Sequence, residues 1–270
     1  MKHVLVTGAN GGMGKATTLY LAKNGYHVYA LDLSTPEEEQ ENITYIKCDV
    51  TNLESIESAK KIISQETDSL DALINMVGIY MLNSLIEMSE ADFERIFKVN
   101  VTGTFLINKT FVNMLKPKSK IIIITSELAK RSSLPFTGIY GLTKKTLDEY
   151  AYSLKMELQL LDIYVSVLRP GAVKTGMIDV STKHLDSFIQ NTTHYNVSSK
   201  NFKKIVDKVE AKNIEPLLIA KKITKILDKK KPKFSYNINH NKLLKLLDIL
   251  PRGWRFKIIK KILKPKEENK

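Results

Sequence analysis

Short runs of aliphatic and β-branched residues alternate with longer segments of helical periodicity over the first two-thirds of the chain. An apolar run without polar alternation is typical of a parallel strand that is buried on both faces. The alternation of such runs with helices indicates repeated βα units, which build a parallel sheet. The expected strands are residues 4–7, 28–31, 43–46, 72–75, 121–125 and 165–168, and the expected helices are 14–24, 52–66, 89–115 and 141–161.

The pattern changes after residue 176, where the chain becomes helical and irregular. Ligands of a doubly wound sheet bind outside the carboxyl ends of its strands, so a segment that follows the last strand can cover a substrate. We therefore expect an α/β fold of the Rossmann type, a doubly wound parallel sheet with helices on both faces. Residues 1–235 would form this domain, with a substrate lid over 176–228, and residues 236–270 would form a helical C-terminal extension.

The C-terminal extension is basic and amphipathic. Residues 221–270 hold 17 Lys or Arg and 4 Asp or Glu, which accounts for the whole net charge of +13. A uniformly basic nucleic-acid surface is therefore not expected. Two helical patterns flank Pro251, and in the second, which begins at Trp254, apolar residues and lysines fall on opposite arcs. Such a pair suits an anionic membrane surface, or it covers the protein's own core or a subunit partner.

A glycine-rich stretch, Thr7 to Gly14, lies between the first expected strand and the first expected helix. Glycines at such a turn let the backbone approach a pyrophosphate and place a helix N-terminus against its negative charge. Asp32 ends the second strand about 20 residues further on, where a carboxylate accepts hydrogen bonds from ribose hydroxyls and repels a 2′-phosphate. This favours NAD over NADP, unless Asp32 is only a turn residue before Pro36.

Tyr140 and Lys144 lie four residues apart at the start of an expected helix, on one face. A phenol has a pKa near 10, which makes it a poor base at neutral pH. A nearby ammonium favours the phenolate, so we expect Lys144 to lower the pKa of Tyr140. The phenol could then exchange a proton with a carbonyl or alcohol oxygen.

Together these stretches resemble the short-chain dehydrogenase/reductase family, classical type. The glycine spacing fits this family, although Gly11 also makes it fit the sugar-nucleotide epimerase branch. The resemblance implies an enzyme that transfers a hydride between a nicotinamide cofactor and a carbonyl or alcohol. A cofactor-sensing or scaffold protein that keeps the fold without turnover is the alternative from another class.

The resemblance also assigns roles to further residues. Ser126 would orient the substrate, although it lies 14 positions before Tyr140 and a gapless match would place Glu127 there. Asn100 would anchor a water relay behind the lysine, or else it only bonds locally to backbone. The catalytic set is thus Ser126, Tyr140, Lys144 and Asn100. The expected cofactor-binding residues are Thr7, Gly8, Asn10, Gly12, Met13, Gly14, Asp32, Asp49, Val50, Asn75, Gly78, Tyr140, Lys144, Pro170, Gly171, Val173 and Thr175.

The remaining expectations concern partners and location. Cys48 is the single cysteine, which fits a reducing cytoplasm and gives neither a disulfide nor a metal site. No secretory signal and no apolar run long enough to cross a bilayer is visible. We expect a small-molecule substrate, apolar or lipid-like if the tail binds the inner face of a membrane, and a homo-oligomer, as is common in the family.

Overall fold

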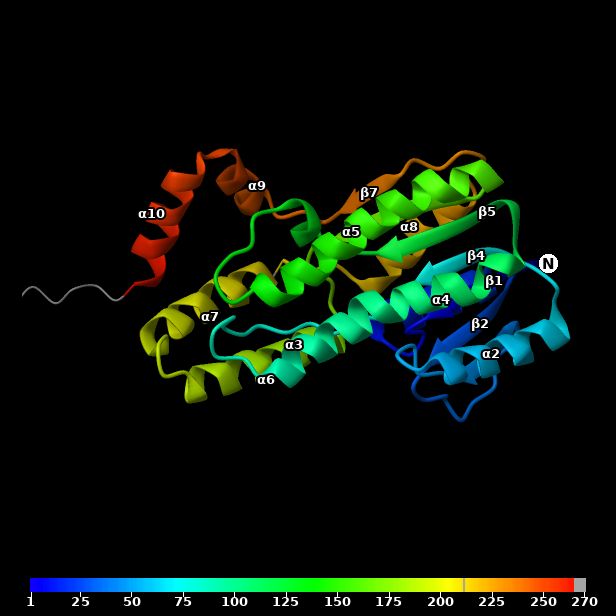
Figure 1. Cartoon of the computed structure of the whole chain (residues 1–270), viewed down its shortest axis with the longest axis horizontal. Helices are drawn as coiled ribbons and strands as arrows, with labels where there is room; N and C mark the ends of the chain where they lie inside the picture. Colours follow the sequence, from blue (N-terminus) through cyan, green and yellow to red (C-terminus); the bar gives the residue numbers. More distant parts are fainter. Residues whose placement is uncertain (211, 265–270) are drawn as a thin grey trace, which may run out of the picture.

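A seven-stranded parallel sheet in the order β3-β2-β1-β4-β5-β6-β7 forms the centre of the molecule (Figure 1). The computed structural model describes residues 1–210 and 212–264, including the side chains of all of these except 177–183, 209 and 210. The expected doubly wound α/β fold is confirmed. The strands are β1 (Lys2–Thr7), β2 (Tyr26–Asp32), β3 (Ile43–Lys47), β4 (Leu70–Asn75), β5 (Leu115–Ile124), β6 (Tyr164–Pro170) and β7 (Ser235–Ile238).

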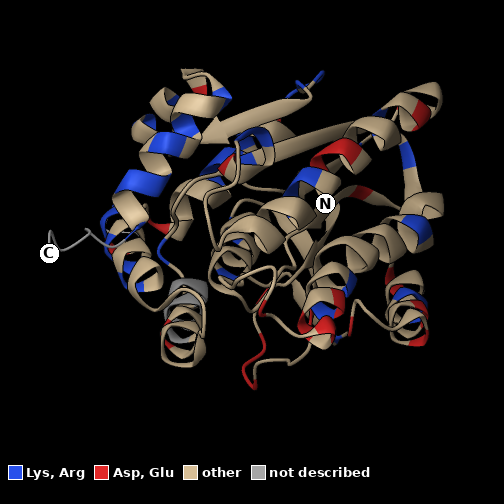
Figure 2. Cartoon of the chain, turned by 60° about the vertical axis from the view of Figure 1, so that its left-hand side comes forward, with Lys and Arg blue, Asp and Glu red and all other residues tan. Residues whose placement is uncertain are grey.

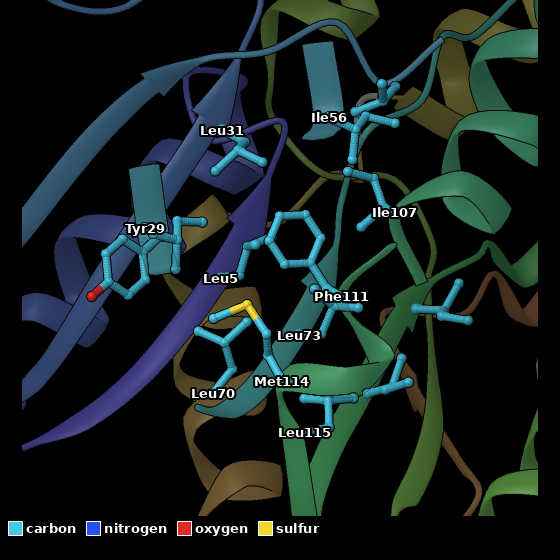
Figure 3. Close-up of a cluster of buried hydrophobic side chains, with 14 of the residues drawn as sticks. Leu5, Tyr29, Leu31, Ile56, Leu70, Leu73, Ile107, Phe111, Met114 and Leu115 are labelled. Carbon is cyan, nitrogen blue, oxygen red and sulfur yellow. The ribbon is translucent and has the colours of Figure 1, made fainter. Parts of the chain in front are cut away.

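Helices cover both faces of this sheet, because successive strand residues point to opposite sides. Leu5 joins the apolar cluster beneath α2, α4 and α5, where Phe111 reaches in from α4 (Figure 3). Its neighbour Val4 joins the cluster beneath α1 and α8. The helices are α1 (Gly12–Lys23), α2 (Leu53–Glu66), α3 (Glu90–Phe97), α4 (Gly103–Phe111), α5 (Gly138–Leu158), α6 (Gly176–Asn191), α7 (Asn196–Glu210), α8 (Pro216–Leu227), α9 (Lys242–Ile249) and α10 (Arg252–Leu263).

The expected helix over 89–115 is divided. A π-helical turn, η1 (Lys98–Thr102), separates α3 from α4, and β5 already begins at Leu115. Asn100, at the centre of the π turn, is fully buried. Single π turns inside α-helices often mark functional sites.

Two boundaries in the last third of the chain differ from expectation. The seventh strand, β7, pairs with β6 and crosses the expected domain boundary between residues 235 and 236, so the helical extension begins only at α9. In addition, α8 packs against the sheet through Ile219 and Ile223, and is therefore not part of a lid. The expected lid reduces to α6 and α7, which share an apolar cluster with Phe136.

The carboxyl ends of the strands point toward the end of the molecule where α6, α7, α9 and α10 gather (Figure 1). The strand order reverses at β1, because β2 pairs with one side of it and β4 with the other. Ligands of such sheets bind at this reversal, so the fold itself places the site. Among the helices of 1–210 and 212–264, none is long and apolar enough to cross a membrane.

Candidate active site

A pocket opens at the carboxyl ends of β4, β5 and β6. It brings together expected residues from the glycine-rich loop, the end of β4, the start of α5 and the segment after β6. The name 'segment after β6' covers residues 170–175, from the last residue of β6 to the residue before α6. The expected residues that line the pocket are Met13, Gly78, Ser126, Tyr140, Lys144, Pro170, Gly171, Val173 and Thr175.

Tyr140 lies in the first turn of α5, and its phenol hydrogen-bonds Ser126. Ser126 directly follows β5, and its Oγ also accepts a hydrogen bond from the Leu128 N–H at 3.2 Å. The loop that leads to α5 bends at Phe136, whose φ is +64°. Ser126 and Glu127 both line the pocket with Tyr140, but only Ser126 interacts with the phenol, since the Glu127 carboxylate is held by Arg131 and Asn241.

Lys144 lies one turn beyond Tyr140, with its Nζ 5.6 Å from the centroid of the phenol ring. The ammonium donates a hydrogen bond of 3.2 Å to the Ile124 carbonyl at the end of β5. Burial lowers the pKa of Lys144 to about 8. The lysine therefore carries a proton at neutral pH but releases it in the mildly alkaline range.

Burial also raises the pKa of Tyr140 to about 12, against the smaller opposing effect of the hydrogen bond with Ser126. The net shift of the Tyr140 pKa is therefore opposite to the one we expected from Lys144. The reason is physical: the buried phenolate would lose its hydration, and this desolvation is the largest influence on the pKa. Tyr140 is therefore a protonated donor over the physiological range, which suits the reduction of a carbonyl.

Asn100 fastens the segment that follows β4. Its Oδ1 accepts from the Ile79 N–H at 2.7 Å, and its Nδ2 donates to the Ile79 carbonyl at 3.0 Å and to the Thr143 Oγ1 at 3.1 Å. A Cβ added to Gly78 would lie 3.2 Å from the Lys144 Nζ and 3.4 Å from the Asn100 Oδ1. Asn100 and the Lys144 Nζ thus both lie close to Gly78, and Asn100 bonds to backbone that is distant in the sequence.

The glycine-rich loop turns tightly between β1 and α1. Gly8 has a φ of +69°, which side chains rarely adopt, and a Cβ at Gly14 would lie 1.8 Å from the Gly8 carbonyl oxygen. A Cβ at Gly12 would lie 2.6 Å from the Thr175 methyl group, so the loop meets the segment after β6. No side chain caps the start of α1, which leaves its N–H groups available for an anion.

Asp32 is tied to this loop. Its Oδ2 accepts a hydrogen bond from the Asn10 N–H at 2.8 Å, and its Oδ1 accepts one from the Leu33 N–H at 2.8 Å. The Asn10 side chain in turn donates to the Ser34 carbonyl. A carboxylate is therefore fixed at the end of β2 beside the glycines, where a dinucleotide's ribose would lie.

Other expected cofactor residues have mainly structural contacts. The Thr7 Oγ1 accepts from the Met76 N–H at 3.2 Å, and Val50 packs against Gly103. The Asp49 Oδ1 accepts from the Thr51 N–H and Oγ1, both at 2.8 Å. The Asn75 side chain donates to the Asn108 Oδ1 at 2.8 Å, so it points toward α4 and not into the pocket.

Sequence reasoning missed the residues that form the apolar wall. Phe202, Ile205 and Val206 of α7 line the pocket, together with Leu134 and with Leu244 of α9. The spacing of the three α7 positions is that of one helix face and could have indicated an apolar wall. Nothing in the sequence indicates that α9 returns to the site, because this contact depends on long-range packing.

Glu127, which a gapless match would place at the serine position, links the pocket to the C-terminal helices. The carboxylate is buried, and its Oε2 accepts from the Arg131 Nε at 3.2 Å and from the Asn241 N–H at 2.8 Å. Arg131 continues to Asp248 of α9 with an Nη1–Oδ2 distance of 3.2 Å. The segment beside the serine is thereby joined to the C-terminal helices.

These residues fit a dinucleotide. The uncapped helix start and the bare glycine backbone suit a pyrophosphate, and the Asp32 carboxylate suits ribose hydroxyls. The pocket holds a proton donor, Tyr140, and a cation, Lys144, next to an apolar wall. Within the described ranges, no group of three or more His, Cys, Asp or Glu side chains is arranged to hold a metal ion.

Comparisons with known proteins agree with this geometry. A family model described as short chain dehydrogenase matches residues 2–186. Over 252 residues, 93% of this chain and 92% of the other, the chain is 27% identical to a 3-ketodihydrosphingosine reductase of Bacteroides thetaiotaomicron. Two solved structures share the fold. One is a 3-ketoacyl-(acyl-carrier-protein) reductase from Brucella melitensis complexed with NADH, with a TM-score of 0.71, 19% identity and coverage of 88% of this chain and 96% of the other. The second is ElxO with NADP bound, with a TM-score of 0.66, 24% identity and coverage of 87% of this chain and 97% of the other.

Proposed function

The chain belongs to the short-chain dehydrogenase family, and from this premise we propose that it transfers a hydride between NAD(H) and an apolar carbonyl or alcohol. Membership makes it an oxidoreductase, and the NADH and NADP bound in two structures of the same fold support a nicotinamide cofactor. The observation that carries the proposal is the meeting of Ser126, Tyr140 and Lys144 in one pocket beside the glycine-rich loop.

The nicotinamide, when bound, supplies the hydride to the carbonyl carbon or receives it from the alcohol. The protein's own side chains handle the proton. In reduction, the Tyr140 hydroxyl donates its proton to the carbonyl oxygen as the C–H bond forms, and the Ser126 hydroxyl hydrogen-bonds the same oxygen. The Lys144 ammonium lies close enough to stabilise the phenolate that remains. Oxidation of the alcohol runs through the same groups in reverse.

For the cofactor we propose NAD rather than NADP. The support is the Asp32 carboxylate, which hydrogen bonds from Asn10 and Leu33 hold at the end of β2. A fixed negative charge there accepts hydrogen bonds from two ribose hydroxyls and repels a 2′-phosphate. Gly11 supplies no positive charge that could compensate. Met13, Val173 and Thr175 would contact the nicotinamide ring. Asp49 and Val50 would contact the adenine ring at the other end of the cofactor.

For the substrate we propose an apolar, lipid-like carbonyl compound. Phe202, Ile205, Val206 and Leu244 give the pocket an apolar wall. Such a wall binds hydrocarbon and gives little to a sugar. The relative whose name is 3-ketodihydrosphingosine reductase, which covers nearly the whole chain, supports a substrate with a long apolar part.

Two further proposals concern the setting of the enzyme. We propose the cytoplasm as its compartment, supported by a single cysteine that is buried and unpaired.

We also propose a homo-oligomer that forms through α4 and α5. Its support is the row of large apolar side chains that these helices leave exposed, including Phe105, Tyr152 and Met156.

The offset of Ser126 from the family's usual serine position is the feature that favours a silent sensor or scaffold protein. We favour turnover because Ser126, Tyr140 and Lys144 line one pocket. The epimerase branch usually carries a C-terminal substrate domain, whereas here the described chain after β6 supplies α6 to α10 and the edge strand β7. The hydride-transfer reading therefore has the most support.

The test is a fluorescence titration of the purified protein with NADH and NADPH. Turnover assays then follow the loss of the absorbance of the reduced nicotinamide. Carbonyl substrates of three kinds would be compared: long-chain 3-keto lipids, short aliphatic ketones and sugars. We expect tighter NADH binding and turnover of the long-chain compounds. Binding of either cofactor without turnover of any carbonyl would contradict the proposed reaction.

A further inference from the structure

The C-terminal arm, residues 241–263 with α9 and α10, is fixed beside the catalytic pocket. Asp248 lies at its centre, with Oδ2 3.2 Å from the Arg131 Nη1 and Oδ1 3.2 Å from the Ser132 N–H. The Arg255 guanidinium contacts Asp248 at 3.3 Å and also donates to the Ser132 hydroxyl. These contacts bind the arm to the loop that runs from Ser126 to Tyr140.

The side of the arm that faces the protein is already occupied. Leu263 is buried, and together with Ile259 it packs into the apolar cluster around Phe202 of α7. Leu244 of α9 faces the pocket. The arm therefore has a defined inner face, and the remaining side chains form an outer face.

The outer face is unusually apolar for a surface. Its large apolar side chains keep most of their area exposed: Leu243 74%, Leu246 61%, Ile249 72%, Trp254 66% and Phe256 70%. Single exposed apolar residues are ordinary on a protein surface, but five large ones within two consecutive short helices favour an interaction site. The sequence pattern left open whether the apolar residues of the tail cover the protein's own core: Ile259 and Leu263 do, whereas these five do not.

The same outer face is strongly basic. Figure 2 shows Lys and Arg along both helices near the C-terminus of the chain. The single acid of the arm, Asp248, is turned toward Arg131 and Arg255 and so neutralises none of the outward charge. The exposed basic residues of the arm are Lys242, Lys245, Arg252, Lys257, Lys260 and Lys261.

This combination identifies the class of partner. A second copy of the arm would bring six like charges against six, which opposes self-association through this face. Interleaved lysines and large apolar residues suit the boundary of an anionic bilayer, where the apolar groups enter the acyl region and the ammonium groups reach the headgroups. Tryptophan is also favoured at this boundary.

We propose that the C-terminal arm docks the enzyme on an anionic lipid bilayer. The pocket lies at the same end of the molecule, and Leu244 belongs both to the arm and to the pocket wall. An apolar substrate could then pass from the membrane to Tyr140 without crossing water. This route rests on the proposed function, whereas the docking itself does not.

Trp254 is the only tryptophan of the chain, so its fluorescence reports on the arm alone. The full-length protein, without cofactor or substrate, would be titrated with vesicles of phosphatidylcholine and with vesicles that also contain phosphatidylglycerol. We expect a blue shift with the phosphatidylglycerol vesicles and little change with phosphatidylcholine. An unchanged spectrum with both, or an equal shift with both, would overturn the proposal.

Two variants and a control test the assignment to residues. Ile249→Ser combined with Leu246→Ser removes outward apolar groups, and Lys257→Gln combined with Lys260→Gln removes outward charge. Each basic residue near an anionic surface is worth about 1 kcal/mol, so the charge variant should partition roughly 30-fold more weakly. Leu160→Ser with Leu161→Ser, exposed at the end of α5, should bind vesicles like the unchanged protein.

Because the altered side chains are exposed, the variants should keep their unfolding temperature, which circular dichroism would check. A blue shift that depends on protein concentration without lipid would show that the arm joins two copies, and would overturn the bilayer proposal. Since the readout uses neither cofactor nor carbonyl, loss of vesicle binding with intact turnover refutes the docking alone. Intact vesicle binding without turnover refutes the reaction alone.

Discussion

Burial sets the chemistry that the individual side chains of the pocket can perform. It raises the pKa of Tyr140 to about 12 and lowers that of Lys144 to about 8, so both groups hold their proton at neutral pH and Lys144 releases its own first as the pH rises. The types and spacing of these residues could be predicted from the sequence. The direction of the Tyr140 shift could not, because it depends on how completely the folded chain excludes water from the phenol.

The pKa of Lys144 predicts the pH dependence of carbonyl reduction. The reaction needs the ammonium, which is fully present below pH 8 and is lost as the pH rises through about 8, while Tyr140 stays protonated. We expect kcat/KM to be level near neutral pH and to fall by about tenfold per pH unit at higher pH. In Lys144→Arg, whose guanidinium keeps its proton, the residual activity should lose this alkaline decline. A wild-type profile that stays level to pH 10 would contradict the role given to the lysine.

The Asp32 carboxylate predicts the cofactor preference. Asp32→Ser removes the charge that would face a 2′-phosphate, and we expect the ratio of kcat/KM for NADH over NADPH to fall by at least about tenfold, equivalent to about 1.4 kcal/mol. Asp49→Asn is the matched control, because the family assigns Asp49 to the adenine, which both cofactors share. An unchanged ratio in Asp32→Ser would show that another group reads the ribose.

At the scale of elements, one carboxylate holds the turn between α6 and α7, the two helices of the proposed substrate lid. The Glu87 Oε2 accepts from the Thr192 Oγ1 at 2.7 Å, and its Oε1 accepts from the Thr193 N–H and Oγ1 at 2.8 and 2.9 Å and from the His194 N–H at 3.1 Å. Desolvation opposes the charged form, but these hydrogen bonds outweigh it and lower the pKa of Glu87 to about 2. Glu87 thus joins the turn between α6 and α7 to the segment before α3.

Glu87→Ala should therefore loosen the lid and leave the sheet intact. We expect amide hydrogen exchange across residues 192–196 to become about tenfold faster or more, and KM for an apolar substrate to rise while NADH binding is retained. Glu94→Ala, which removes an exposed carboxylate from α3, serves as the control. Equal exchange rates in the two variants would show that Glu87 does not hold the lid.

The elements that were predicted well are determined by the residue pattern within each segment. Those that were missed depend on contacts with segments that are distant in the sequence. Strands such as β1 and β6 were found because their buried runs are apolar on both faces. In contrast, β7 has only four residues, Ser235–Ile238, of which Tyr236 alone is buried, so pairing with β6 creates the strand. The π turn around Asn100 could not be predicted from the sequence either. Its central side chain hydrogen-bonds the backbone of Ile79, and this contact forms only in the folded chain.

At the scale of the whole molecule, the reversal of strand order at β1 gathers the chemistry. The glycine-rich loop, Ser126, Tyr140 and the segment after β6 are separated by up to 162 positions, from Met13 to Thr175. They nevertheless line one pocket, because parallel strands end at one edge of the sheet. Their order along the chain made this meeting predictable. The return of α9 to the pocket was not predictable, since it rests on the Glu127, Arg131 and Asp248 contacts.

The most direct test of the whole account is Tyr140→Phe, measured in parallel for NADH binding and for carbonyl turnover. The substitution removes one hydroxyl and leaves the ring in its buried position, so the glycine-rich loop and Asp32 keep their geometry. We expect the dissociation constant for NADH to stay within about twofold and kcat to fall by at least about 100-fold, because the proton donor is lost. Retained turnover with intact NADH binding would contradict the account, since it would remove Tyr140 from the chemistry.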